Sequence, residues 1–182
     1  MGLISFLVTT YNTLQPFFAK DIFHGDAATY GYINAATGLG ALVSTLLIAS
    51  QKNGNNLKRI LFGNLILLGF GLILMSYVQS LPVYLFMSIL CGFGVMSVIP
   101  ICNTIVQTVS SSQMRGRVVG FFAMATMGML PLGAIVIGWL SRLIGARHCQ
   151  LIQGIVCLLI AAVFSPFLHR AYTKPKPVIQ LP

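Results

Sequence analysis

The longest uncharged run of the chain decides its fold, and residues 60–109 read "ILFGNLILLGFGLILMSYVQSLPVYLFMSILCGFGVMSVIPICNTIVQTV". No Asp, Glu, Lys or Arg lies between Arg59 and Arg115. A membrane helix needs about 20 mostly apolar residues, so this run is too long for one crossing and fits two. The segment "YVQSLP" (residues 77–82) supplies a turn between them. We therefore expect two membrane helices, at about residues 60–77 and 83–109.

The composition of the whole chain also indicates a membrane protein. Hydrophobic residues make up 57% of it and charged residues 7%, whereas about a quarter of the residues of a soluble protein are charged. A net charge of +9 would suit nucleic acid if the basic residues formed one stripe. They lie instead at the breaks between apolar runs, as loops beside membrane spans do. We expect the lipid bilayer as the surroundings and no nucleic-acid partner.

The remaining apolar runs predict four more spans, at about residues 2–19, 29–50, 118–140 and 151–168. The N-terminus lacks the basic start and cleavage site of a signal peptide, so its run is expected to remain as a span. The sequence thus predicts an all-α, polytopic membrane bundle of six transmembrane helices over residues 1–170. Residues 171–182 are expected to form a basic cytoplasmic tail without regular structure.

The distribution of basic residues predicts the orientation, because cytoplasmic loops carry an excess of Lys and Arg. Six spans place both termini on one side of the membrane. If that side is the cytoplasm, the inner segments carry Lys52, Lys58, Arg59, Arg115, Arg117, Arg170, Lys174 and Lys176, and the outer ones carry Lys20, Arg142 and Arg147. We therefore expect cytoplasmic termini. Arg115 and Arg117 would lie where the chain turns at the inner surface, with Gly116 allowing a tight turn.

Small residues recur on one face of two spans and predict close helix packing. At 100° per residue, the fifth span gathers Gly116, Gly120, Ala123, Met127, Pro131, Ala134 and Gly138 on one face, and the second gathers Gly31, Ala35, Gly38, Leu42, Thr45 and Ala49. Gly128 and Gly133 are further packing candidates in the fifth span. Pro100 and Pro131 each remove a backbone hydrogen bond and are expected to bend their helices.

Polar residues inside the spans are candidates for a substrate cavity. They are Tyr11, Asn12, Gln15, Asn34, Thr37, Asn103 and Gln107. An unpaired amide is costly in hydrocarbon, so each must face either another helix or a wet cavity. Asn103 and Gln107 are four apart and share a face. Interhelical hydrogen bonding is an alternative for each residue alone, whereas the set as a whole favours a cavity.

No catalytic or metal-binding set is visible in the sequence. The only acids, Asp21 and Asp26, fall in an outer loop with His24. The four cysteines, Cys91, Cys102, Cys149 and Cys157, show no Cys-x-x-Cys spacing and are expected to pack as small apolar residues. We expect neither an enzyme nor a metal site, and no cofactor.

Two segments carry a resemblance to a known family: "YGYINAATGLGAL" (residues 30–42) and "QTVSSSQMRGRVVGFFAMATMGMLPLGAIVIGWLSRLIGAR" (residues 107–147). The chain resembles the C-terminal six-helix half of a major facilitator superfamily transporter, of the branch with enterobactin and macrolide or multidrug exporters. The resemblance implies two inverted three-helix repeats around a site near the bilayer midplane. It also implies a bacterial inner-membrane location. The family's loop after this second helix often carries an acid among its bases, whereas "QKNGNNLKR" (residues 51–59) has only bases.

The resemblance leads to a functional hypothesis. The chain would be the C-terminal half, or a truncated form, of a secondary transporter that exports a small lipophilic molecule or siderophore by proton-coupled alternating access. Residues of the cytoplasmic loops would take part in gating: Lys52, Arg59, Arg115, Gly116 and Arg117. The partner would be the missing N-terminal half or a second copy, and a proton-binding carboxylate would come from that other half. The alternative is a membrane helical protein that does not transport, either a truncated gene product or an interaction partner.

Overall fold

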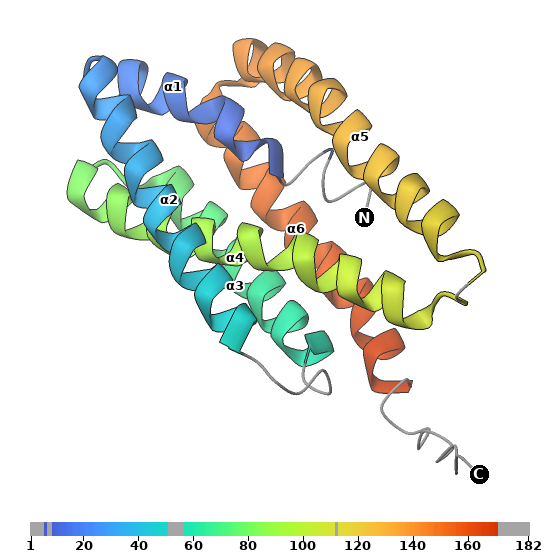
Figure 1. The fold of residues 1–182 in the computed structure, drawn as a ribbon. Helices are drawn as coiled ribbons and strands as arrows, with labels where there is room; N and C mark the ends of the chain where they lie inside the picture. The colour runs from blue at the N-terminus through green and yellow to red at the C-terminus, as the bar shows by residue number, and fades with distance from the viewer. Residues whose placement is uncertain (1–5, 7–8, 51–56, 112, 171–182) are drawn as a thin grey trace, which may run out of the picture.

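A computed structural model describes residues 6, 9–50, 57–111 and 113–170, and these form a bundle of helices without a strand (Figure 1). The elements are η2 (Thr9–Leu14), α1 (Gln15–Phe17), η3 (Phe18–Ile22), α2 (Ala27–Ser50), α3 (Leu57–Tyr77), α4 (Leu81–Val109), α5 (Arg115–Ile144) and α6 (Ala146–Arg170). The all-α membrane bundle is therefore confirmed. Most of residues 1–8, the loop with Lys52 and the tail at 171–182 lie outside the described residues.

Five of the described helices are long and apolar enough to cross a membrane. They are Ala27–Ser50, Arg59–Tyr77, Leu81–Thr108, Arg115–Ile144 and Ala146–Val163. The chain is an integral membrane protein. Its helices run back and forth, so that the end of α2, the start of α3 and the α4–α5 connection lie at one end of the bundle (Figure 1). The α1–α2, α3–α4 and α5–α6 connections lie at the opposite end.

The first helical segment is irregular, in contrast to the single span expected at 2–19. A 3₁₀ segment, η2, passes into the short α1 and then into η3, a π-helical turn that ends at Ile22. Pro16 lies at the start of α1 and has no N–H to donate. The wider turn of η3 is closed by the hydrogen bond from the Phe23 N–H to the Phe18 carbonyl, at 3.0 Å. Such local changes of helix type restore the backbone hydrogen bonds that proline interrupts.

The helices are longer than the sequence predicts, and this corrects the expected turn at Gly116. α5 begins at Arg115, so that Arg115, Gly116 and Arg117 form its first turn, while the connection from α4, which ends at Val109, lies before them. At 1.5 Å per residue, this helix is about 45 Å long against roughly 30 Å of hydrocarbon. Charged residues therefore do not mark where the helix ends. α6 likewise begins at Ala146 rather than near residue 151.

A single residue, Gly145, joins α5 to α6. Its φ is 85°, in the left-handed region that only glycine adopts readily. The Gly145 N–H donates to the Ser141 carbonyl at 3.0 Å, and the Cys149 N–H donates to the Gly145 carbonyl at 3.2 Å. These two bonds tie the joint to both helices.

The helices pack through glycines at several crossings, among them that of α3 with α4, where Gly94 lies beside Leu68. α2 lies against α4, where a side chain at Gly40 would collide with the Ile89 carbonyl and one at Gly92 with the Thr37 carbonyl. α3 lies against α6, where Gly154 leaves room for the carbonyl of Gly69. Small residues permit this close backbone approach, which substitutes for hydrophobic burial in lipid.

The glycines that the sequence singled out for packing are mostly not at these crossings. Open space surrounds Gly31, Gly38, Gly116, Gly120, Gly128 and Gly138. Of the predicted packing glycines, only Gly133 is in close contact, against the Phe6 carbonyl and the Thr10 side chain. Among the described residues of this chain, the other predicted packing glycines therefore make no close helix contact. The small-residue face of α2 lies roughly 180° from the buried face, which carries Ile33, Ala36, Gly40 and Ser44.

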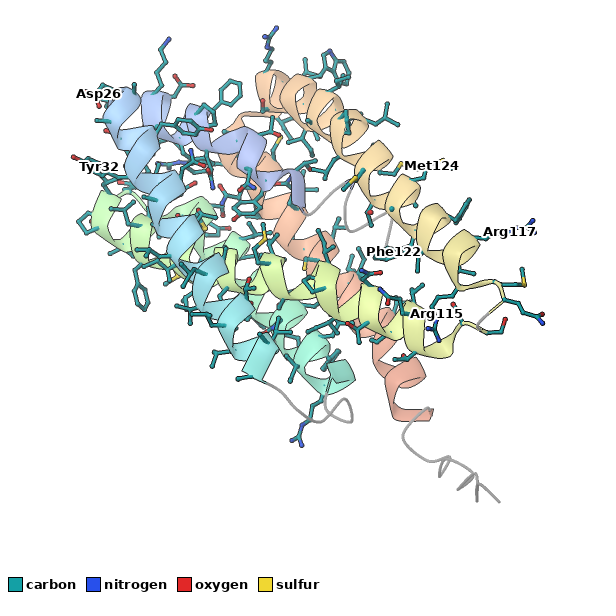
Figure 2. All side chains as sticks on the ribbon, viewed as in Figure 1. Asp26, Tyr32, Arg115, Arg117, Phe122 and Met124 are labelled. Carbon is teal, nitrogen blue, oxygen red and sulfur yellow. The ribbon has the colours of Figure 1, made fainter. Side chains whose placement is uncertain are left out.

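The open small-residue face of α5 adjoins a different exposed face made of large apolar side chains. Phe121, Met124, Ile135 and Trp139 are each at least 64% exposed. Figure 2 shows Met124 and Arg117 extending from the outer side of α5, and Tyr32 from the outer side of α2. A large apolar surface is typical of a lipid-facing side, whereas faces of small residues are typical of places where membrane helices approach one another closely.

Candidate functional site

The polar residues of the first helical segment divide between the interior and the surface of the bundle. Tyr11 and Gln15 are each 1% exposed, whereas Asn12 is exposed. The Gln15 Nε2 donates to Asn12 Oδ1 at 3.1 Å and to the Thr37 hydroxyl at 3.3 Å. Gln15 therefore connects the first helical segment to α2. Its contact with Thr37 is the interhelical alternative that the sequence left open.

The α2 candidates lie at the edge of the same region. The Thr37 hydroxyl donates its proton to the Ile33 carbonyl at 2.9 Å, and its oxygen accepts the hydrogen bond from Gln15. Asn34 is exposed and donates only to the Tyr30 carbonyl of its own helix, at 3.3 Å. Gln15 thus links Asn12 to Thr37, and Asn34 lies about one turn before Thr37 on α2.

The α4 candidates form a separate pair. The Gln107 Nε2 donates to Asn103 Oδ1 at 3.2 Å, as their spacing predicts. Thr37 packs against Gly92 of α4, and Asn103 lies about 16 Å further along that helix. The seven predicted cavity residues therefore form two groups at different depths, and Tyr11 and Gln15 are enclosed within the bundle.

The predicted gating residues gather at the end of the bundle that holds the α4–α5 connection. Arg59, Arg115, Gly116 and Arg117 are exposed, and Lys52 lies outside the described residues. The first turn of α5 carries the two arginines and no acid. Because the helix dipole is positive at this end, this turn concentrates positive charge and suits an anionic surface such as lipid phosphates.

The opposite end of the bundle carries the two acids. Asp26 Oδ1 accepts from the backbone N–H groups of Thr29, at 3.1 Å, and Ala28, at 3.0 Å, which caps the start of α2. The Thr29 N–H is the main reason why the pKa of Asp26 is lowered. A surface pocket of about 360 Å³ lies beside it, between Lys20 and Tyr30. Among the described residues, no group of three His, Cys, Asp or Glu could hold a metal.

Two buried glutamines of α6 were missed by the sequence interpretation. Gln150 and Gln153 are each 1% exposed, and the Gln153 Nε2 donates to the Thr10 hydroxyl at 3.4 Å. Gln150 was overlooked because Arg147 and His148 suggested a loop up to residue 150, whereas Gln153 lay inside the span expected at 151–168 and was not singled out. Their spacing of three on a helix was the signal available, since it places both amides on one face.

The comparisons with known proteins agree with this architecture. The family model described as Major Facilitator Superfamily matches residues 1–182. The multidrug efflux pump Tap of Mycolicibacterium fortuitum is 28% identical over 149 residues, which are 81% of this chain and 36% of the pump. The pump of the same name from Mycobacterium tuberculosis (strain ATCC 25618 / H37Rv) is 29% identical over 117 residues, covering 63% of this chain and 28% of the pump. No solved structure matches the chain.

The chain thus spans about a third of the length of these relatives. The family match extends over all 182 residues, including both glycine-rich segments of the resemblance. It agrees with a helical bundle in which five described helices are long and apolar enough for the membrane. The chain belongs to the Major Facilitator Superfamily.

Proposed function

We propose that this chain is one half of a drug-exporting secondary transporter and works as a transporter rather than as an enzyme. The observation that carries the proposal is the similarity to the Tap multidrug efflux pumps. The match to the Mycolicibacterium fortuitum pump covers 81% of this chain. The substrate class is a small, largely apolar molecule. The host membrane is the bacterial cytoplasmic membrane, with both termini on the cytoplasmic side.

The open faces of α2 and α5 support a companion six-helix half as the partner. Gly31 and Gly38 of α2, and Gly116 and Gly120 of α5, meet no other group of the described chain. A helix of a second half could approach these faces as closely as α4 approaches Gly40. The relatives are about three times as long as the matched part, which leaves room for such a half.

The exposed polar side chains support a cavity shared with that half. Asn12, Asn34 and Gln107 are on accessible surfaces, and lining a cavity would give each a polar partner. In the described helices, the acids Asp21 and Asp26 lie at the outer end and not inside a membrane span. A proton-coupling carboxylate would therefore come from the companion half.

Transport by membrane vesicles tests the proposal. The vesicles contain either this chain alone or this chain with the polypeptide encoded immediately upstream of it, and they take up a lipophilic dye with or without a proton gradient. Gradient-dependent uptake only with both polypeptides supports the proposed half. Uptake by this chain alone would indicate that a second copy of the chain, and not a companion half, completes the transporter. Absence of uptake in both preparations would contradict the transport function and favour the non-transporting alternative.

A further inference from the structure

A layer of buried polar side chains crosses the core beside the first helical segment. It consists of Tyr11, Gln15, Gln150 and Gln153, and each is 1% exposed. Thr37 of α2 lies beside the Tyr11 hydroxyl and Tyr84 of α4 beside Gln150, although neither pair has the geometry of a formed hydrogen bond. The polar layer therefore joins the first helical segment to α6, and α2 and α4 each place one polar side chain beside it.

Many hydrogen-bond donors and acceptors of the polar layer have no partner in the described part of the protein. Among the described residues, five atoms of the polar layer have no hydrogen-bond partner: the Tyr11 hydroxyl, Gln15 Oε1, both side-chain atoms of Gln150, and Gln153 Oε1. Buried amides without partners are strongly disfavoured, and more so in a membrane protein, whose surroundings supply no hydrogen bonds. Five such atoms in one layer require an explanation, and a bound water molecule is one that buried polar groups commonly have.

The chemistry of these atoms indicates their partner. Three amide oxygens accept, the Gln150 amide nitrogen donates, and the Tyr11 hydroxyl does either. No side chain of the polar layer carries a charge that would hold an ion. A water molecule both donates and accepts, and it is stable inside a protein when it has two to four polar partners.

We propose that the polar layer is an internal water site, in which Tyr11, Gln15, Gln150 and Gln153 bind at least one water molecule inside this half. The site links the first helical segment to α6, which share one direct side-chain hydrogen bond here, between Gln153 and Thr10. Gln15 also donates to Asn12 of the proposed cavity, so the water site adjoins that cavity, but all four of its side chains belong to this half.

Millisecond hydroxyl-radical labelling of the chain in lipid nanodiscs tests the site, because radicals generated from internal water oxidise the side chains beside it. Tyr11 is expected to be oxidised several-fold faster than Met75. Met75 is fully buried against Cys91, is not one of the polar side chains of the layer, and is intrinsically the more reactive side chain. If Tyr11 stays unlabelled or reacts more slowly than Met75, the water site is wrong.

Substitutions test whether Gln150 and Gln153 hold the proposed water molecule. The double change Gln150→Leu with Gln153→Leu removes three of the unpartnered atoms and is expected to lower Tyr11 oxidation several-fold. The matched control is Gln79→Leu, the same change at an exposed residue outside the polar layer. Unchanged Tyr11 oxidation in the double variant would overturn the proposal. If the double variant loses its helical circular dichroism, the Tyr11 and Met75 comparison in the unaltered chain decides the question.

Discussion

Gly40 and Gly38 lie two residues apart on α2, yet their surroundings are opposite. The Gly40 backbone lies against Ile89 and Phe93 of α4, whereas nothing in the described chain approaches Gly38. The same contrast separates Gly154, at the α3–α6 crossing, from Gly120 of α5. Glycine therefore has two roles here: it closes contacts within the bundle, and it forms smooth faces that this bundle leaves open.

Gly40→Leu is the substitution expected to have the largest effect. Its side chain would have to displace the α4 backbone, so the free energy of unfolding should fall by about 3 kcal/mol or more. Gly38→Leu is the matched control on the same helix. It should change the stability of the chain by less than about 1 kcal/mol. Unfolding by SDS titration in mixed micelles measures both, and equal losses would remove the distinction between closed and open glycines.

A bulky residue on an open face tests what that face is for. With the companion half present, Gly120→Leu should reduce dye transport about tenfold, because losing about 1.4 kcal/mol from an association is a factor of ten. Met124→Leu, on the large apolar side of α5, serves as the control and should leave transport unchanged. Normal transport by the Gly120→Leu protein would show that this face meets lipid and not protein.

Polar contacts offer a smaller comparison of the same kind. The buried Asn64 Nδ2 of α3 donates to the Ser97 hydroxyl of α4 at 2.6 Å, whereas Asn34 bonds only within its own helix. Asn64→Ala should lower the free energy of unfolding by about 1 kcal/mol, and Asn34→Ala by much less. A double-mutant cycle with Ser97→Ala isolates the pair. A coupling near zero would mean that the crossing depends on its glycines alone.

The smallest effect is expected at Asp26, which precedes the helix that carries both kinds of glycine. Its pKa is lowered in the folded chain by the Thr29 N–H, so the charged carboxylate stabilises the fold above its unfolded pKa of about 3.9. That contribution is lost as the pH falls through the lower folded pKa. The melting temperature of the unaltered chain should therefore fall slightly more between pH 6 and pH 3 than that of Asp26→Asn, which keeps a capping oxygen without the charge. Identical pH profiles would contradict the role of the charge.

Much of the architecture was predictable because charge and apolar length constrain a chain in lipid strongly. The uncharged run at 60–109 predicted two helices, and the structure has α3 and α4 there. Helix ends were less predictable. A helix that extends beyond the hydrocarbon can carry Arg115, Arg117 and Arg142 within its regular structure, so charge does not mark its terminus.

Which face of a helix packs was not predictable, and the reason is physical. In water an apolar stripe identifies the buried side, but in a membrane every side of α2 is apolar or small. The periodicity of Gly31 and Gly38 was real, yet it described the open face, while the packed glycine, Gly40, stood outside the pattern. The roles of the candidate cavity residues stay predictions. The structure adds that Tyr11 and Gln15 are enclosed, because a sequence does not say which neighbours surround a side chain.

The one-residue joint at Gly145 has a mechanical consequence. Because a single residue separates α5 from α6, we expect a sliding displacement of α5 to be passed directly to the first turns of α6. Gln150 and Gln153 lie in those turns, so we expect a displacement of α5 to reach the proposed water site without a loop to absorb it.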